Sequence, residues 1–347
     1  MRKTGAFFLA AGLILNLTAC GGAQQTEEPA TRQIYAMDTV MQVSAFGESG
    51  EEAVEAVEQE LYDLEDLLSR TREDSWVSRL NRGETLTMEG ELAELLVRAE
   101  HYTRETGGAF DITIAPVAEA WGFTTDTRQV PDADELTELL THVGMAHVHM
   151  KDGGVSLDPG TEIDLGGIAK GYASDRVAEI YEERAVPRGM VYLGGNVLAW
   201  GDRPDGTPWR VGVQDPKNPE DPNALIGILH LRDAFAITSG GYQRYFEEDG
   251  RRYHHIIDPA TGYPSDSGLT SVTVVADKTF GNGTMCDALS TALFVLGEEQ
   301  ALEFWRRAEQ DFDLVLVTED DRVLVTDGLA ERFTPMEGSG YSYETVS

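Results

Sequence analysis

The order of strand-like and helix-like segments most constrains the fold of this 347-residue chain. Apolar residues recur at helical spacing over residues 51–68, 91–106, 284–296 and 298–309. The apolar–polar alternation typical of strands covers residues 34–46, 191–200, 209–213, 225–231, 271–276, 312–317 and 322–325, and Gly194-Gly195-Asn196 is predicted to break the second of these strands. No regular strand–helix–strand rhythm joins these segments. The pattern therefore favours an α+β fold, with mixed, mostly antiparallel sheets flanked by helices, over a doubly wound fold.

Shorter elements fill the gaps between these segments. Residues 69–82 are predicted to form a polar surface loop or a short helix that ends at Asn81. An acidic helix is expected over residues 132–142, and a hairpin over 147–158. A strand that ends near Asp164 is predicted to lead through a glycine turn into a helix over 172–183. Residues 312–317 and 322–325 are expected to pair as the last hairpin.

Charge limits the kinds of partner that this chain can bind. It has 61 Asp and Glu residues against 27 Lys and Arg residues, a formal net charge of −34. Such a surface repels nucleic acid and anionic lipid headgroups, so neither is an expected partner. A small anionic substrate would need a local cluster of Lys or Arg, or a bridging divalent cation, in order to bind.

The N-terminus resembles a signal sequence for export. Arg2 and Lys3 precede an apolar run over residues 5–17, which is too short for a stable membrane span. The following Leu-Thr-Ala-Cys resembles the lipobox of bacterial lipoproteins, which predicts a signal peptide over 1–19 and lipidation of Cys20. Residues 20–31 would then be a flexible tether, and residues 32–347 the folded domain. The alternative is a plain signal peptide with an incidental cysteine.

This signal sequence and its lipobox predict a protein that is anchored by lipid to the cell membrane, on the extracytoplasmic face. Once Cys20 is lipidated, Cys286 is the one remaining thiol, so no disulfide can form within the chain. The stability of the domain must then come from its core.

A histidine and an aspartate lie close together in residues 236–264. A Thr-Ser-Gly-Gly turn over 238–241 leads into an aromatic strand, and a second strand carries His255 towards a turn that begins at Asp258. Alternation places His255 on the face opposite His254. An imidazole beside a carboxylate at a strand end suits proton transfer. The alternative is a structural corner, with Asp258 capping its own turn and a histidine that packs in the core.

A glycine-rich turn over residues 164–171 opens the predicted helix that follows it. Free backbone N–H groups and the positive end of the helix dipole suit a phosphate there, and Lys170 would add a charge. The pattern matches neither the P-loop nor the dinucleotide-binding fingerprint. By itself it therefore does not establish nucleotide binding.

A third polar group lies on an otherwise apolar helix. Asp287, Ser290 and Thr291 project from one face of the helix predicted over 284–296. A carboxylate and two hydroxyls are hard oxygen ligands that suit Mg²⁺. Alternatively, the hydroxyls bond to carbonyls one turn back, and Asp287 interacts with the helix dipole.

Taken together, these motifs resemble the FAD:protein FMN transferases of the ApbE type. The resemblance starts at Met37-Asp38-Thr39, where the family usually has glycine in the middle. It continues through the segments 74–81, 107–111, 121–123, 164–175, 193–196, 237–246, 254–264 and 286–297. These segments follow the family order along nearly the whole mature chain.

The resemblance implies a fold, a flavin site, a metal site and a catalytic residue. It implies an ApbE-like fold with a flavin site in a cleft between sub-lobes. The positions that match FAD contacts are Met37, Thr71, Ala109, Phe110, Asp111, Asp164, Lys170 and Ile257. The positions that match Mg²⁺ ligands are Gly167, through its carbonyl, Asp287, Ser290 and Thr291. His255 matches the histidine implicated in catalysis, with Asp258 as the group that would orient it.

The implied reaction attaches FMN from FAD through a phosphoester to a Thr or Ser of a partner protein and releases AMP. The expected acceptor is another extracytoplasmic protein, because this chain lacks the Ser/Thr-Gly-Ala-Ser/Thr signature of such targets. Two alternatives remain open. One is a Mg²⁺-dependent FAD pyrophosphatase, in which water replaces the hydroxyl, and the other is a flavin-binding lipoprotein without catalysis.

Overall fold

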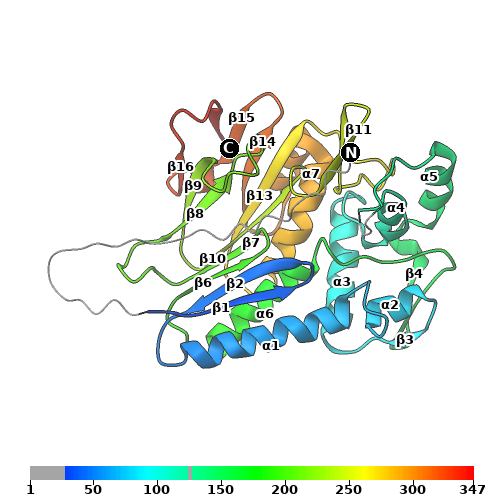
Figure 1. Cartoon of the computed structure of the whole chain (residues 1–347), viewed down its shortest axis with the longest axis horizontal. Coiled ribbons are helices and arrows are strands. Elements are labelled where there is room, and N and C mark those ends of the chain that lie inside the picture. Colours follow the sequence, from blue (N-terminus) through cyan, green and yellow to red (C-terminus); the bar gives the residue numbers. More distant parts are fainter. Residues whose placement is uncertain (1–27, 124–126) are drawn as a thin grey trace, which may run out of the picture.

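The computed structural model describes residues 28–123 and 127–347, and a nine-stranded sheet runs through its middle (Figure 1). The strands are ordered β1-β2-β6-β7-β10-β13-β14-β15-β17. Their bounds are β1 Ala30–Ala36, β2 Thr39–Ala45, β6 Gly189–Leu193, β7 Asn196–Trp200, β10 Ala234–Gly240, β13 Leu269–Asp277, β14 Asp313–Thr318, β15 Arg322–Thr326 and β17 Ser342–Val346. Neighbours pair antiparallel throughout, except β15 with β17. The predicted fold class is confirmed.

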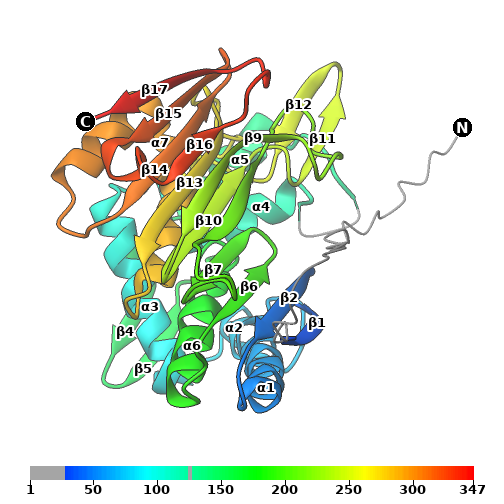
Figure 2. The same ribbon diagram turned by 90° about the vertical axis from the view of Figure 1, so that its left-hand side faces the viewer.

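Helices cover one face of this sheet (Figures 1 and 2). They are α1 (Gly50–Leu68), α6 (Ala169–Glu183), α7 (Asn282–Arg307) and, against α7, α3 (Gly90–Glu105). Their apolar stripes and the facing strand residues form one large buried core. On the opposite face, a small sheet of β8 (Trp209–Gln214), β9 (Leu225–Leu231) and β16 (Phe333–Pro335) closes a second core.

The remaining elements lie beside this framework. They are α2 (Trp76–Asn81), α4 (Ala115–Ala120), α5 (Ala133–Leu139), β3 (Leu86–Thr87), β4 (Val148–Lys151), β5 (Gly154–Leu157), β11 (Tyr245–Glu248) and β12 (Arg251–His254), with short 3-10 turns at Ile112–Ile114, Leu140–His142, Met145–His147 and Asp327–Leu329. The buried ring of Trp121 packs against Phe123, Phe246, Tyr253 and Tyr263. This aromatic cluster ties the β11–β12 hairpin to α4, as expected for large rings that bury their apolar faces together.

The prediction of one strand over residues 34–46 is wrong. The chain reverses at Met37 and Asp38, whose φ angles of 48° and 56° are left-handed, and β1 pairs with β2. Two consecutive left-handed residues make the tight turn that suits a twisted hairpin. The break predicted within the segment 191–200 is confirmed, because Gly194-Gly195 separates β6 from β7. Since β1 begins at Ala30, the last residues of the predicted tether belong to the sheet.

Four other details differ from the prediction. The helix α6 begins at Ala169, within the expected glycine turn, and no strand of the described chain leads into it. Thr238 and Ser239 lie inside β10 rather than in a turn. The predicted last hairpin, β14–β15, is followed by β17, which pairs in parallel with β15. The two helices predicted over 284–309 join as α7, with a kink at Gly297.

The predicted signal peptide and the lipidation site Cys20 lie outside the described residues. Within the described residues, no helix is both long enough and apolar enough to cross a membrane. Cys286 is a free, buried cysteine on α7.

Candidate functional site

His255 lies one residue beyond the end of β12, and the backbone fixes its ring. Its Nδ1 lies 3.2 Å from the carbonyl oxygen of Arg244, which also accepts the His255 backbone N–H at 3.0 Å. Because a carbonyl can only accept, Nδ1 carries the proton and Nε2 presents a lone pair. Burial, together with the nearby cationic side chains of Arg244 and Lys170, lowers the pKa of His255 to about 3. The imidazole is therefore neutral, and the lone pair of its Nε2 is free of a proton.

Asp258 holds the following turn instead of orienting His255. Its carboxylate accepts hydrogen bonds from the backbone N–H of Ala260 at 2.9 Å and from the Thr261 hydroxyl at 3.2 Å. In this structure the group that orients His255 is the Arg244 carbonyl. The capping alternative therefore describes the observed contacts of Asp258.

His254 is the structural member of the pair. Its Nε2 lies 3.0 Å from the Ser265 carbonyl oxygen, and its ring meets the Phe294 ring edge to face. Burial lowers the pKa of His254 below its ordinary value. The two adjacent histidines thus have different surroundings, as the predicted alternation required.

A cluster of hydroxyl and carboxylate oxygens forms where α7, β10 and the loop before α6 meet. The Ser239 hydroxyl lies 2.8 Å from Ser290 Oγ and 3.3 Å from Thr291 Oγ1. A Cβ added at Gly167 would lie 3.6 Å from Thr291 Oγ1, so the Gly167 backbone borders the same hydroxyl. Asp287, on α7, is buried. Ser239 was missed as a site residue, although it belongs to the Thr-Ser-Gly-Gly motif.

Asp287 also holds two helices together. Its Oδ2 accepts the Gly171 backbone N–H at 2.7 Å, in the first turn of α6. Ser290 donates to the Asp287 carbonyl at 2.9 Å, as the structural alternative predicted, whereas Thr291 faces Ser239. Among the described residues, the hydrogen bonds of this carboxylate use Oδ2 alone. The second oxygen, Oδ1, is therefore available to a ligand.

The chemistry of these donors suits one kind of cation. Nowhere among the described residues do three or more His, Cys, Asp or Glu side chains gather as a metal site. The cluster instead combines one carboxylate with neutral hydroxyl and carbonyl oxygens. Such a set fits Mg²⁺, which usually completes its shell with water and substrate phosphates.

The segments expected to contact FAD converge beside this cluster. The Asp164 backbone N–H donates to the Ile112 carbonyl at 2.7 Å, which joins the loop before α6 to the segment 109–112. A Cβ added at Gly167 would lie 3.2 Å from the Phe110 ring, so Phe110 packs against the glycine loop beside Ala109. Lys170 donates to the Gly166 carbonyl at 3.1 Å.

Two of the expected carboxylates serve mainly as local caps. Asp111 Oδ1 accepts the backbone N–H and the hydroxyl of Thr113 at 2.8 and 2.6 Å, and burial raises the pKa of Asp111. Asp164 Oδ1 accepts the Gly166 N–H at 2.7 Å, and its Oδ2 lies 3.4 Å from Arg70. Arg70 was missed, because an arginine in a polar loop carries no local signal of its partners.

The other expected FAD positions lie at the margins. Thr71 is exposed and follows Arg70, whose guanidinium group also pairs with Glu119 and Glu162. Met37 lies in the β1–β2 turn, and Arg244 reaches the carbonyl of Asp38 in that turn at 3.4 Å. Ile257 is buried against the aromatic cluster around Trp121. The turn at Met37 is thus connected through Arg244 to His255.

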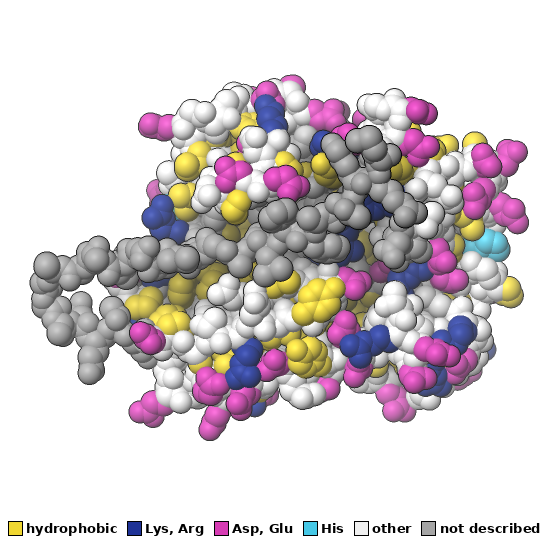
Figure 3. Space-filling model, in the orientation of Figure 1, with side chains coloured by type: hydrophobic (Ala, Val, Ile, Leu, Met, Phe, Trp, Pro, Cys, Tyr) yellow, Lys and Arg dark blue, Asp and Glu magenta, His cyan; other side chains and the backbone are white. Residues whose placement is uncertain are grey.

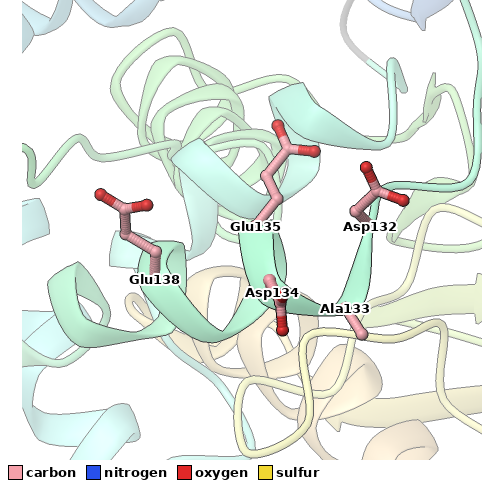
Figure 4. Close-up of a pocket in the computed structure, with 5 residues that line it drawn as sticks. All are labelled: Asp132, Ala133, Asp134, Glu135 and Glu138. Atoms are coloured by element: carbon pink, nitrogen blue, oxygen red, sulfur yellow. The ribbon is translucent and has the colours of Figure 1, made fainter.

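A shallow hollow along α5 is a poor candidate site. It is lined by Asp132, Ala133, Asp134, Glu135 and Glu138 (Figure 4). Figure 4 shows the carboxylates of Asp132, Glu135 and Glu138 pointing to one side and that of Asp134 to the other. A hollow ringed by four carboxylates repels an anionic substrate.

The comparison with protein families decides where this chain belongs. The profile described as the ApbE family matches residues 37–316. The chain belongs to the ApbE family. The match spans the β1–β2 turn, the glycine loop, the His255 corner and the helix α7, which together supply the residues described above.

Several proteins of this family are similar to this chain over most of their length. The FAD:protein FMN transferase of Treponema pallidum is 32% identical over 344 residues, which cover 92% of each chain. That of Klebsiella pneumoniae is 34% identical and covers 80% of this chain. The ApbE protein of Thermotoga maritima superposes with a TM-score of 0.81 at 32% identity, covering 88% of this chain and 99% of its own. The apo flavinyl transferase ApbE of Pseudomonas stutzeri gives a TM-score of 0.76 at 28% identity.

Proposed function

We propose that this chain transfers FMN from FAD to a hydroxyl group of a partner protein. It is an enzyme, and its ApbE relatives are named for this transfer. The observation that carries the proposal is a neutral, backbone-oriented histidine within electrostatic reach of Lys170, whose glycine loop borders the hydroxyl and carboxylate cluster. A protein that only bound flavin would need neither the base nor the cluster.

His255 is the general base of this proposal. With Nδ1 held by the Arg244 carbonyl, Nε2 accepts the proton of the attacking Thr or Ser hydroxyl. The deprotonated oxygen forms a bond to the phosphorus that carries the ribityl group, and the bond from that phosphorus to the AMP oxygen breaks. The products are a phosphoester-linked FMN on the partner and free AMP.

The oxygen cluster would hold Mg²⁺ through the Gly167 carbonyl, Asp287, Ser290 and Thr291. When bound, the ion supplies positive charge against the phosphate oxygens and the departing AMP. Lys170, at the first turn of α6, adds a cation of the chain itself. A chain with a net charge of −34 would hold a pyrophosphate poorly without such local positive charge.

The acceptor and the location complete the proposal. The partner is an extracytoplasmic protein with a Thr or Ser as the attachment site. This chain would be lipid-anchored through Cys20 on the extracytoplasmic face of the cell membrane. The signal-like sequence over residues 1–20 supports this part of the proposal.

The test separates transfer from hydrolysis. The purified protein is incubated with FAD, Mg²⁺ and a protein that carries an acceptor threonine, and AMP and free FMN are quantified. Transfer predicts AMP without an equal amount of free FMN, and predicts that EDTA stops the release of AMP. Equal amounts of AMP and free FMN would instead identify a pyrophosphatase. Bound FAD without any AMP would identify a flavin carrier.

A further inference from the structure

Asn196 has a buried side-chain amide whose nitrogen lacks a hydrogen-bond partner among the described residues. It is the first residue of β7, and only 2% of its surface is exposed. Its side-chain Nδ2 has no hydrogen-bond partner in the described part of the chain. Leaving a buried donor unpaired is unfavourable, and such atoms are rare in folded proteins. The buried amide therefore needs a hydrogen-bond acceptor that the described residues do not provide.

Strand alternation shows which way this amide faces. Leu198 and Trp200 of β7 belong to the core beneath the helices, whereas Ala199 packs in the opposite core. Because side chains alternate along a strand, Asn196 points to the same side as Leu198 and Trp200. The amide thus lies on the helix-covered face of the sheet.

On that face, Asn196 neighbours the oxygen cluster. It pairs with Ile237 of β10, and Ser239 lies two residues farther along β10 on the same face. Diagonal neighbours of this kind are roughly 7–8 Å apart. Ser239 in turn contacts Ser290 and Thr291. The unpaired donor is therefore next to the proposed Mg²⁺ site.

The turn before Asn196 connects it to the other half of the site. A Cβ added at Gly194 would lie 2.4 Å from the Thr39 hydroxyl, so this turn packs directly against the β1–β2 hairpin. Arg244 contacts the same hairpin at Asp38 and positions His255 through its carbonyl. Asn196 thus lies between the oxygen cluster and the hairpin that Arg244 connects to the base.

We infer that Asn196 is a further substrate-binding residue, whose Nδ2 donates a hydrogen bond to an oxygen of the FMN half of FAD. The inference rests on the proposed function, in which the base and the cluster both act on the phosphate that stays with FMN. The acceptor oxygen belongs either to that phosphate or to the flavin ring. Both are oxygens of the same half of the substrate.

The chain offers a matched control for this residue. Ser271 Oγ is the other buried side-chain atom without a partner in the described residues. Ser271 precedes Val272, which faces the helices, so Ser271 points to the opposite side of the sheet. Removing its hydroxyl deletes an unpaired polar atom on the face of the sheet opposite the proposed contact.

The experiment compares Asn196→Leu and Ser271→Ala with the parent protein. Dissociation constants for FAD, FMN, riboflavin and AMP are measured by calorimetry with Mg²⁺ present, beside the melting temperature. For Asn196→Leu we expect binding of FAD and FMN to weaken about tenfold, the equivalent of one hydrogen bond. AMP binding and the melting temperature should not fall, because the variant buries no unpaired donor. Ser271→Ala should bind all four ligands as the parent does.

The riboflavin arm distinguishes the two sources of the acceptor oxygen. Weaker riboflavin binding in Asn196→Leu would assign the contact to the flavin ring, and unchanged binding would assign it to the phosphate. Unchanged FAD and FMN binding, or an equal loss for AMP, would overturn the inference and make Asn196 a structural residue. If Asn196→Leu does not fold, Asn196→Asp serves instead, and parent-like FMN binding by that variant overturns the inference. A parent protein that binds no FAD would refute the proposed function itself.

Discussion

At the scale of single residues, the decisive contact is the one between His255 and the Arg244 carbonyl. A histidine at a strand end was predictable from the sequence, and so was its separation from His254. Its orienting partner was not predictable, because Arg244 lies eleven positions earlier and reaches His255 only through the fold of the β11–β12 hairpin. The nearby Asp258 instead bonds within its own turn.

Replacing this histidine tests its role directly. His255→Ala should bind FAD as the parent does, because the imidazole acts on the attacking hydroxyl and not on FAD. FMN transfer should fall by roughly 100- to 10,000-fold, the usual worth of a general base. Calorimetry measures FAD binding, and AMP release measures the rate. His149→Ala, which removes an exposed histidine on β4, is the control and should change neither quantity.

The pH dependence of the same reaction checks the protonation state. The pKa of His255 is lowered from its ordinary value of 6.5, so the imidazole stays neutral at pH values well below 6.5. Because protonation would inactivate the base, the His255-dependent rate should hold steady as pH falls from 8 to 6. A rate that halves near pH 6.5 in the parent, on an unchanged protein fold, would contradict this assignment.

At the scale of elements, α6 and α7 cap each other. Asp175 of α6 accepts the backbone N–H groups of Gly283 and Thr284, at 2.8 and 2.9 Å, in the first turn of α7. Asp287 of α7 accepts the N–H of Gly171 in the first turn of α6. These contacts satisfy helix N–H groups that have no partner within their own helix. The crossing fixes Asp287, and with it the oxygen cluster.

Glycine permits this close crossing, so Gly171→Ala should loosen it. A Cβ at Gly171 would lie 2.4 Å from the Gly283 carbonyl oxygen and 2.5 Å from the Asp287 Cβ. Alanine favours a helix by about 1 kcal/mol, but a backbone clash costs about 1–3 kcal/mol, so the free energy of unfolding should fall. The Mg²⁺ concentration needed for half-maximal activity should rise, because Asp287 moves.

Urea denaturation and a Mg²⁺ titration of the rate measure the two effects. Gly154→Ala is the matched control, since a Cβ there would meet its nearest neighbour at an ordinary 3.5 Å. Parent-like stability and Mg²⁺ dependence in Gly171→Ala would show that the crossing does not position the cluster. The sequence predicted both helices and the residues on them, but their mutual capping joins residues 108 or more positions apart. No local pattern reports such a contact.

At the scale of the whole molecule, an acidic protein provides a local site for an anion. Acidic side chains spread over the face shown in Figure 3, with basic ones between them. Around the candidate site, Arg70, Lys170 and Arg244 lie among the residues expected to contact FAD. The net charge could be read from the composition, whereas bringing these three cations together from two loops and the first turn of α6 required the fold.

The sequence predicted the fold class and most helices and strands, but it did not predict all the turns and strand pairings that connect them. Helical and strand spacing identified α1, α3, α7 and most strands, because those patterns are local. The reversal at Met37-Asp38 was missed, since non-glycine residues in a left-handed turn leave no clear signal. The parallel pairing of β17 with β15 was missed for another reason: it depends on how the C-terminus returns to the sheet edge.

The measurement that tests the central claim most directly is the intact mass of the acceptor protein after incubation with this enzyme, FAD and Mg²⁺. The account predicts a mass gain equal to one phosphoester-linked FMN, accompanied by AMP. The gain should disappear with EDTA, with the His255→Ala enzyme, and when the acceptor threonine is replaced by alanine. An unchanged acceptor mass, although FAD is consumed and AMP and free FMN accumulate, would contradict the transfer and show that water takes the place of the hydroxyl.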